Sequence, residues 1–125
     1  MVGKSKAEGF NEFSSKLAEI QANNKKLIIL FSGSKDLEGK SWCPDCVTVE
    51  PVIEKVINTL SDDFEFLYVG VGDKTSWKDP KCIFRTDERL KLRFIPTLLY
   101  WGTSKRLEED QCLDEENIKM LFEED

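Results

Sequence analysis

Residues 27–46 have the sequence LIILFSGSKDLEGKSWCPDC, and this stretch decides the fold. The apolar run Leu27–Phe31 is typical of a strand that is buried on both faces of a parallel sheet. The polar residues and glycines of 32–41 predict a loop. Pro44 favours the first turn of a helix, which places Cys43 close to the helix N-cap. The sequence therefore predicts a buried strand, a loop and a helix that begins at a cysteine.

The spacing of Cys43 and Cys46 places both sulfur atoms on one face of this helix. At a helix N-terminus, backbone N–H groups and the helix dipole stabilise a thiolate. Cys46 lies one turn further along, so we expect only Cys43 to meet solvent. Such a pair suits thiol–disulfide exchange, in which the outer thiolate attacks a substrate disulfide and the inner thiol then resolves the mixed disulfide.

Two further features flank this pair in the predicted architecture. Trp42 precedes Cys43 and can either line the surface around the sulfur atoms or serve only in packing. Pro96 stands before a predicted strand and can simply mark its start. A cis Ile95–Pro96 peptide bond would instead leave a backbone edge free to pair with a substrate chain. The residues alone leave both questions open.

The rest of the chain predicts alternating helices and strands. Hydrophobic periodicity and turn residues predict helices over 8–22, from Pro44 to about Leu60, over 84–92 and after Asp114, strands over 64–71, 97–101 and 105–108, and a loop over 72–81. The resulting order, α-β-α-β-α-β-β-α, predicts a single α/β domain over residues 1–125.

Composition excludes several classes of function. The chain has 125 residues, a net charge of -6 and no histidine. The absence of histidine removes Ser–His–Asp and Cys–His catalysis, and the acidic balance disfavours nucleic acid as a partner. No apolar run reaches the ~20 residues that cross a bilayer. The N-terminal sequence lacks the apolar region of a secretory signal, so we expect a cytoplasmic protein that binds no membrane.

A zinc site built from all four cysteines is the alternative use of Cys43 and Cys46. Structural zinc favours two close pairs of ligands, whereas Cys82 and Cys112 stand far apart in the sequence. We therefore expect no bound metal and interpret Cys82 and Cys112 as ordinary small residues, with Cys82 the more exposed.

The motifs WCPDC, Pro51 and Ile95-Pro96-Thr97 together resemble the thioredoxin family. The longer stretches FSGSKDLEGKSWCPDCVTVEPV, WKDP and PTLLYWGT are similar to its small cytosolic members of the WCPDC type, and the resemblance runs from about Gly9 to Asp125. It implies a thioredoxin fold, in which a central mixed β-sheet has helices on both faces.

The resemblance also implies an activity and its partners. Members of this group are disulfide reductases without a bound cofactor, and thioredoxin reductase regenerates them with electrons from NADPH. The implied substrates are cystine and protein disulfides, with side activity on peroxide and S-nitrosothiols, and a dynein light chain is an implied binding partner. Carried onto this sequence, Cys43 is the attacking nucleophile and Cys46 the resolving thiol. The remaining implied site residues are Pro44 and Asp45, which tune the reduction potential, and Trp42, Ile95 and Pro96, which contact substrate, with Pro96 in the cis form.

The sequence departs from ordinary thioredoxins at one functional position. Their first central strand carries a buried acid that helps to move the proton of the inner thiol, whereas Leu27–Phe31 has no ionisable group. Asp45, Glu38 or water would then have to act as the base for Cys46. The alternative function is a redox-regulated binding module with the thioredoxin fold and no turnover.

Overall fold

The computed structural model describes residues 1–123, so residues 124 and 125 at the end of the predicted 1–125 domain lie outside the described residues. Its centre is a mixed sheet in the order β1-β3-β2-β4-β5. The parallel strands are β1 (Gly3–Glu8), β3 (Phe64–Gly70) and β2 (Lys26–Ser32), and β4 (Thr97–Tyr100) and β5 (Arg106–Glu108) are antiparallel to their neighbours. The predicted α/β class with a central mixed sheet is confirmed.

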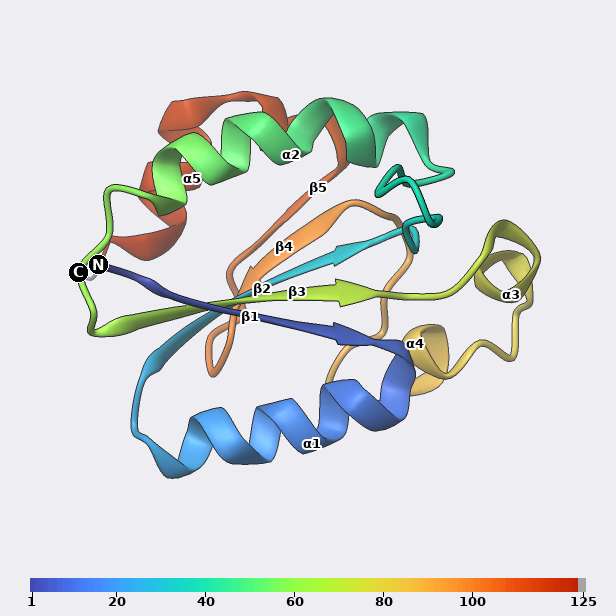
Figure 1. Ribbon diagram of the computed structural model, residues 1–125, viewed down its shortest axis with the longest axis horizontal. Helices are drawn as coiled ribbons and strands as arrows, with labels where there is room; N and C mark the ends of the chain where they lie inside the picture. Colours follow the sequence, from blue (N-terminus) through green and yellow to red (C-terminus); the bar gives the residue numbers. More distant parts are fainter. Residues whose placement is uncertain (124–125) are drawn as a thin grey trace.

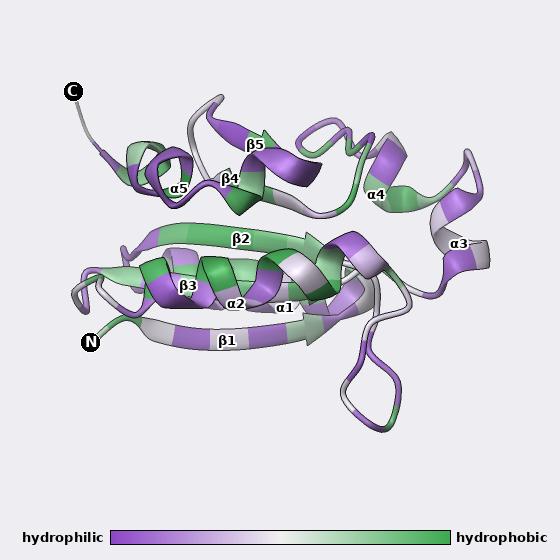
Figure 2. Cartoon of the chain, turned by 90° about the horizontal axis from the view of Figure 1, so that it is seen from above, coloured by the Kyte–Doolittle hydropathy of each residue, from purple (hydrophilic) through white to green (hydrophobic). Residues whose placement is uncertain are grey.

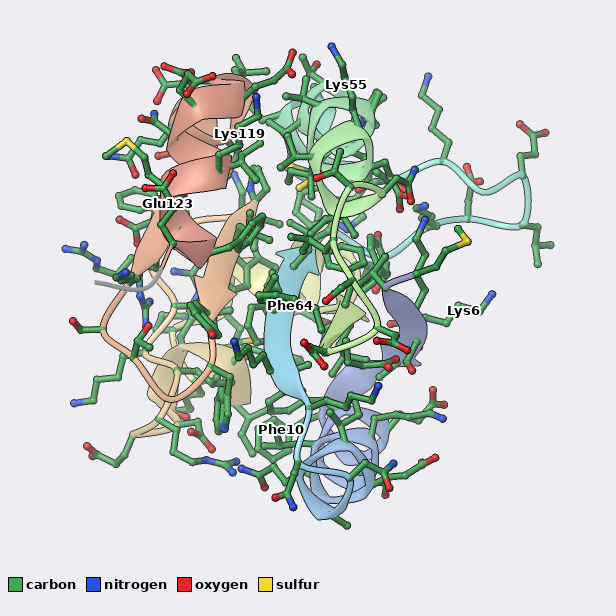
Figure 3. The ribbon with its side chains drawn as sticks, turned by 90° about the vertical axis from the view of Figure 1, so that its left-hand side faces the viewer. Lys6, Phe10, Lys55, Phe64, Lys119 and Glu123 are labelled. Atoms are coloured by element: carbon green, nitrogen blue, oxygen red, sulfur yellow. The ribbon has the colours of Figure 1, made fainter. Side chains whose placement is uncertain are left out.

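Helices cover both faces of this sheet, as expected (Figure 1). One face carries α1 (Gly9–Ala22), and the other carries α2 (Pro44–Ile57) and α5 (Glu115–Phe122). Figure 3 shows the same arrangement from the side, with α2 and α5, labelled at Lys55 and Lys119, opposite the helix that carries Phe10. The Lys55 ammonium lies 3.1 Å from the Glu115 carboxylate, which joins α2 to α5 at the surface.

Strand β2 occupies the middle of the sheet because its side chains are apolar in both directions. Ile29 and Phe31 belong to the core beneath α1, and Ile28 and Leu30 belong to the core beneath α2. Figure 2 shows β2 hydrophobic over most of its length, while the edge strand β1 is mostly hydrophilic. A strand with two buried faces needs this composition, so the prediction from Leu27–Phe31 is confirmed.

Strand β1 is the main element that the sequence prediction missed. Its sequence GKSKAE has no apolar alternation, and most of its side chains are exposed or half-buried. It forms because its backbone pairs in parallel with β3, from Gly3 opposite Glu65 to Glu8 opposite Gly70. The register depends on a partner strand far away in the sequence, so local patterning does not reveal it.

Three predicted segments differ in extent. The helix expected over 84–92 is α4 (Ile83–Thr86), which ends where the Asp87 carboxylate accepts the Arg89 N–H at 2.8 Å. The loop expected over 72–81 contains α3 (Lys74–Lys78), and α2 ends at Ile57 rather than near Leu60. A 3-10 helix, η1 (Glu109–Leu113), precedes α5, and the Asp114 side chain caps α5 as predicted.

The core beneath α1 is built around aromatic rings. Phe13 is fully buried and contacts Phe10, Phe31, Phe84 and Trp101, with ring centroids between 5.6 and 6.5 Å apart. Cys43 and Cys46 belong to the same buried cluster. The packing that holds α1 on the sheet therefore continues to the predicted site.

Across residues 1–123, no helix combines the length and the hydrophobicity that a membrane-crossing segment requires.

Candidate active site

The cysteine pair lies where the parallel strands end. Strands β1, β2 and β3 run in the same direction, and α2 begins near their carboxyl ends (Figure 1). In sheets of this kind, ligands bind beyond the carboxyl ends of the strands. The predicted position of the site at the start of a helix is therefore also the position that the topology favours.

Cys43 is the N-cap residue of α2, and Pro44 is the first residue of the helix. The backbone N–H of Cys46 donates to the Cys43 sulfur at 3.2 Å, and the Ser41 hydroxyl accepts the Cys43 N–H at 3.1 Å. A sulfur atom that receives a helix N-terminal N–H is stabilised as a thiolate. The Cys43 sulfur therefore lies among the free N–H groups of the first turn of α2.

The exposure of the pair differs in part from the expectation. Only 6% of the Cys43 surface meets solvent, and Cys46 is 1% exposed. Cys43 is the outer residue, as expected, but it is far more covered than a freely open site would leave it. A substrate disulfide must therefore approach Cys43 along a defined direction.

Burial dominates the chemistry of Cys46. It raises the pKa of the Cys46 thiol to about 12, and the hydrogen bond with Cys43 adds to the rise. The Gly33 N–H, 3.5 Å from the Cys46 sulfur, and the Ser32 hydroxyl act in the opposite direction. Because the raised pKa lies far above neutrality, Cys46 is a protonated thiol in the reduced protein at pH 7.

We expect iodoacetamide to modify Cys43 and to spare Cys46 in the native protein at pH 7. With a pKa of about 12, the thiolate fraction of Cys46 at pH 7 is about 10⁻⁵, and it rises about tenfold with each pH unit. Mass-spectrometric mapping of the alkylated peptides between pH 7 and pH 10 measures both cysteines. Equal labelling of the two residues at pH 7 would contradict this account of Cys46.

Gly33 is a site residue that sequence reasoning missed. A Cβ atom on Gly33 would lie 2.8 Å from Cε2 of Trp42, 2.9 Å from Oγ of Ser41 and 3.0 Å from Cβ of Cys43. The backbone of Gly33 therefore passes directly beneath the residues that present Cys43. Only a residue without a side chain allows this close approach.

Replacing Gly33 by Ala should slow the reaction of Cys43 with a disulfide about 10-fold to 100-fold, because the added methyl group displaces Trp42 and Cys43. Gly3→Ala is the matched control, since its Cβ would meet only the flexible end of the Glu65 side chain at the sheet edge. The reaction rates of the two variants are compared at equal concentrations of folded protein, which circular dichroism checks. Equal activities of the two variants would argue against a close approach at Gly33.

Trp42 packs against a neighbouring loop and also lines a surface groove. Its indole N–H donates to the Gly72 carbonyl at 2.9 Å, which fixes the ring against the loop before α3. The ring also lines a groove of about 770 Å³ between residues 34–42 and the start of α2. Pro44 lines this groove as well, and charges of both signs surround it, from Lys35, Lys40, Asp36 and Asp73.

The predicted substrate-binding residues Ile95 and Pro96 precede β4. The Ile95–Pro96 peptide bond is cis, as the resemblance implies. Ile95 is buried in the cluster that contains Cys43 and Cys46. The Pro96 carbonyl is already engaged, because it accepts the Glu109 N–H at 2.9 Å. This carbonyl is therefore not part of the free backbone edge that the sequence analysis considered.

The two carboxylates considered as bases for Cys46 are not brought to it. Asp45 is exposed in the first turn of α2, and Glu38 is exposed in the loop before it. The groups that perturb the Cys46 thiol are Cys43, the Gly33 N–H and the Ser32 hydroxyl. Ser32 and Gly33 lie in the quoted sequence, but nothing in their local pattern marks them as neighbours of a sulfur.

The four cysteines do not gather into one site. Cys112 is fully buried in the core beneath α2, with its thiol directed to the Leu107 carbonyl, and Cys82 is half-buried at the start of α4. Among residues 1–123, no three Cys, Asp or Glu side chains come together as a possible metal site. The zinc alternative therefore has no ligand set in the described part of the chain.

Comparisons of the sequence with known proteins agree on one family. A family model described as "Thioredoxin domain-containing protein 17-like, thioredoxin domain" matches residues 6–124. Thioredoxin domain-containing protein 17 of Mus musculus is 46% identical over 117 residues, which cover 94% of this chain and 92% of that protein. Thioredoxin-like protein Clot of Arabidopsis thaliana is 36% identical over 106 residues, which cover 78% of this chain and 79% of that protein.

The fold is similar to that of solved thioredoxins. The crystal structure of oxidised thioredoxin O1 from Arabidopsis thaliana matches with a TM-score of 0.62 and 18% sequence identity, covering 97% of this chain and 99% of that chain. At this identity the match establishes the fold, and the thioredoxin fold expected from the sequence is confirmed.

Proposed function

We infer that this chain, which belongs to the thioredoxin domain-containing protein 17-like family, is a disulfide reductase that works through Cys43 and Cys46. Thioredoxin-fold proteins are generally thiol–disulfide oxidoreductases, and one observation carries the inference for this chain. Cys43 caps α2 with a backbone N–H at 3.2 Å from its sulfur, while the protonated thiol of Cys46 is held beneath it.

The proposed reaction has two exchange steps. The Cys43 thiolate attacks one sulfur of the substrate disulfide, so that a mixed disulfide forms and the other substrate thiol leaves. Cys46 then attacks the Cys43 sulfur, which forms the Cys43–Cys46 disulfide and releases the second substrate thiol. In our proposal, thioredoxin reductase returns the pair to the dithiol with electrons from NADPH, so that the chain needs no bound cofactor. Pro44 and Asp45, between the two cysteines, tune the potential of this step.

The groove that Trp42 and Pro44 line, on either side of Cys43 in the sequence, supports small disulfides as substrates. Its charges of both signs, from Lys35, Lys40, Asp36 and Asp73, are complementary to a zwitterion such as cystine. Trp42, Ile95 and Pro96 contact the substrate around Cys43. The loop that carries Lys35 and Lys40 extends away from the sheet (Figure 3), so large folded disulfides should react more slowly than small ones. The same thiolate would act on peroxide and S-nitrosothiols in a cytoplasmic setting.

The second candidate is a redox-regulated binding module without turnover. The small exposure of Cys43, 6% of its surface, is the observation that favours it. In this role the disulfide would form once and change the affinity for a protein partner, of which the resemblance suggests a dynein light chain.

A coupled assay separates the two candidates. The protein is mixed with NADPH, thioredoxin reductase and cystine, and NADPH absorbance is followed. A reductase consumes NADPH continuously at a rate proportional to its concentration, and the Cys82→Ser variant should match the parent because Cys82 lies outside the site. Oxidation of one equivalent of NADPH followed by silence would identify the binding module instead.

A further inference from the structure

We propose that the hydroxyl groups of Ser32 and Tyr68 carry away the proton that Cys46 loses when it resolves the mixed disulfide. This inference rests on the proposed function. It assigns two neutral side chains to a step for which ordinary thioredoxins use a buried acid. The two carboxylates considered for this step, Asp45 and Glu38, are both exposed.

The three groups meet at a single peptide unit. The Gly33 N–H lies 3.5 Å from the Cys46 sulfur, and the Gly33 carbonyl lies 3.4 Å from both the Ser32 Oγ and the Tyr68 hydroxyl. These O–H···O distances are long, since such bonds are commonly 2.5–3.0 Å. Neither hydroxyl is therefore committed to the carbonyl, and each can rotate toward another acceptor.

The sheet explains why these side chains gather. Side chains two positions apart on a strand share a face, so Ser32 lies on the same face as Leu30, toward α2. Leu30 is the register partner of Tyr68 on β3, which makes Ser32 and Tyr68 diagonal neighbours. Helix α2 packs on this face and brings Cys46 to the end of β2.

Burial prevents direct loss of the proton to water. Ser32 and Cys46 are each 1% exposed. Ser32 opposes the rise of both pKa values, because its hydroxyl favours the Cys46 thiolate and the Tyr68 phenolate. The thiol and the two hydroxyl groups therefore gather around the Gly33 peptide unit, away from solvent at Ser32 and Cys46.

Burial, together with nearby carboxylates, keeps Tyr68 neutral. Burial raises the pKa of Tyr68 to about 12, and the charges of Glu50 on α2 and Glu8 at the end of β1 add to the rise, together with Cys46. Lys35, from the loop, lies 4.7 Å from the centre of the Tyr68 ring and 2.6 Å from the Glu50 carboxylate. A neutral phenol suits a relay, which must accept one proton as it gives up another.

Tyr68 also provides the path to water. Its half-buried side chain lines a surface groove of about 340 Å³ together with Lys35 and Glu50. The proposed route from Cys46 through Ser32 to Tyr68 thus leads from the buried sulfur to the protein surface. It lies on the face of the sheet that α2 covers, opposite the aromatic core beneath α1.

The proton of Cys46 leaves along the two hydroxyl groups while the disulfide is exchanged. As the Cys46 thiol passes its proton to the Ser32 oxygen, the Ser32 hydroxyl proton passes to Tyr68, and the Tyr68 proton passes to water in the groove. The Cys46 sulfur forms a bond to the Cys43 sulfur, and the bond between Cys43 and the substrate breaks. The departing substrate thiolate takes up a proton from water. The cysteine pair is oxidised by two electrons, the substrate is reduced, and both hydroxyls are regenerated.

Stopped-flow mixing of the reduced protein with dithiobis(nitrobenzoate), in a Cys82→Ser background, tests the proposal because each exchange step releases one coloured thiolate. In Ser32→Ala and Tyr68→Phe, the first release by Cys43 should stay within twofold of the parent. The second release by Cys46 should slow about tenfold or more for Ser32→Ala and severalfold for Tyr68→Phe. Ser32→Thr, which keeps a hydroxyl, should resolve at nearly the parent rate.

The pH profile separates a relay from a packing effect. In Ser32→Ala, the rate of the second release, by Cys46, should reach a given value only at a higher pH than in the parent. The rate of the first release, by Cys43, should depend on pH as it does in the parent. A second release that is unchanged in both Ser32→Ala and Tyr68→Phe, or equal slowing of both releases, would overturn the proposal. If the parent protein itself gives no coloured release, the proposed function fails rather than the relay.

Discussion

Replacing Cys43 by Ser is expected to abolish disulfide reduction, with kcat/KM for cystine falling at least about 10³-fold. A serine hydroxyl is not ionised at neutral pH and cannot attack a disulfide in place of a thiolate. Cys46 cannot take over, because it is 1% exposed and its pKa is raised to about 12. The NADPH-coupled assay measures the loss.

The control for this variant is Cys82→Ser, which removes a half-buried thiol outside the site. It should keep the parent rate. Cys43 occupies the helix cap, and Ser is a preferred N-cap residue, so the fold of Cys43→Ser should be intact by circular dichroism. Residual turnover within tenfold of the parent would show that a residue other than Cys43 attacks the substrate.

Replacing Phe13 by Ala should produce the largest loss of stability, about 3–5 kcal/mol in the free energy of unfolding. Phe13 is fully buried, and its ring contacts Phe10, Phe31, Phe84 and Trp101. Truncation leaves a cavity between α1 and the sheet that these rings cannot fill without moving. Urea unfolding followed by tryptophan fluorescence measures the change.

Phe94→Ala is the matched control, because the Phe94 side chain is 40% exposed. It should cost less than about 1 kcal/mol. If the two variants unfold at the same urea concentration, the aromatic cluster around Phe13 is not the centre of this core.

The sequence predicted those elements whose determinants are local. The apolar run Leu27–Phe31 predicts a strand buried on both faces, and Pro44 after Cys43 predicts the start of a helix, because both signals lie within a few residues. Strand β1 has no such signal. Its place is set by the backbone of β3, and its polar side chains are tolerated because it is the edge of the sheet.

The same distinction applies to the candidate site. The spacing of Cys43 and Cys46 and their place at a helix start follow from the sequence alone. Ser32, Gly33 and Tyr68 could not be found in this way, because the contacts that make them relevant join β2, β3 and α2. The sequence also predicts a more exposed Cys43 than the structure has. The hydrogen bond that fixes the neighbouring Trp42 joins it to Gly72, in a loop distant in the sequence.

The most direct test of the central claim is to trap the mixed disulfide. Cys46→Ser and Cys43→Ser are each prepared in a background that also carries Cys82→Ser and Cys112→Ala, so that no other thiol can react. After incubation with cystine, intact-mass analysis of Cys46→Ser should show one added half-cystine that dithiothreitol removes, because no thiol remains to resolve it. Cys43→Ser should show little adduct. An adduct of equal amount in both variants, or one that forms only when Cys46 is present, would contradict the assignment of Cys43 as attacker and Cys46 as resolver.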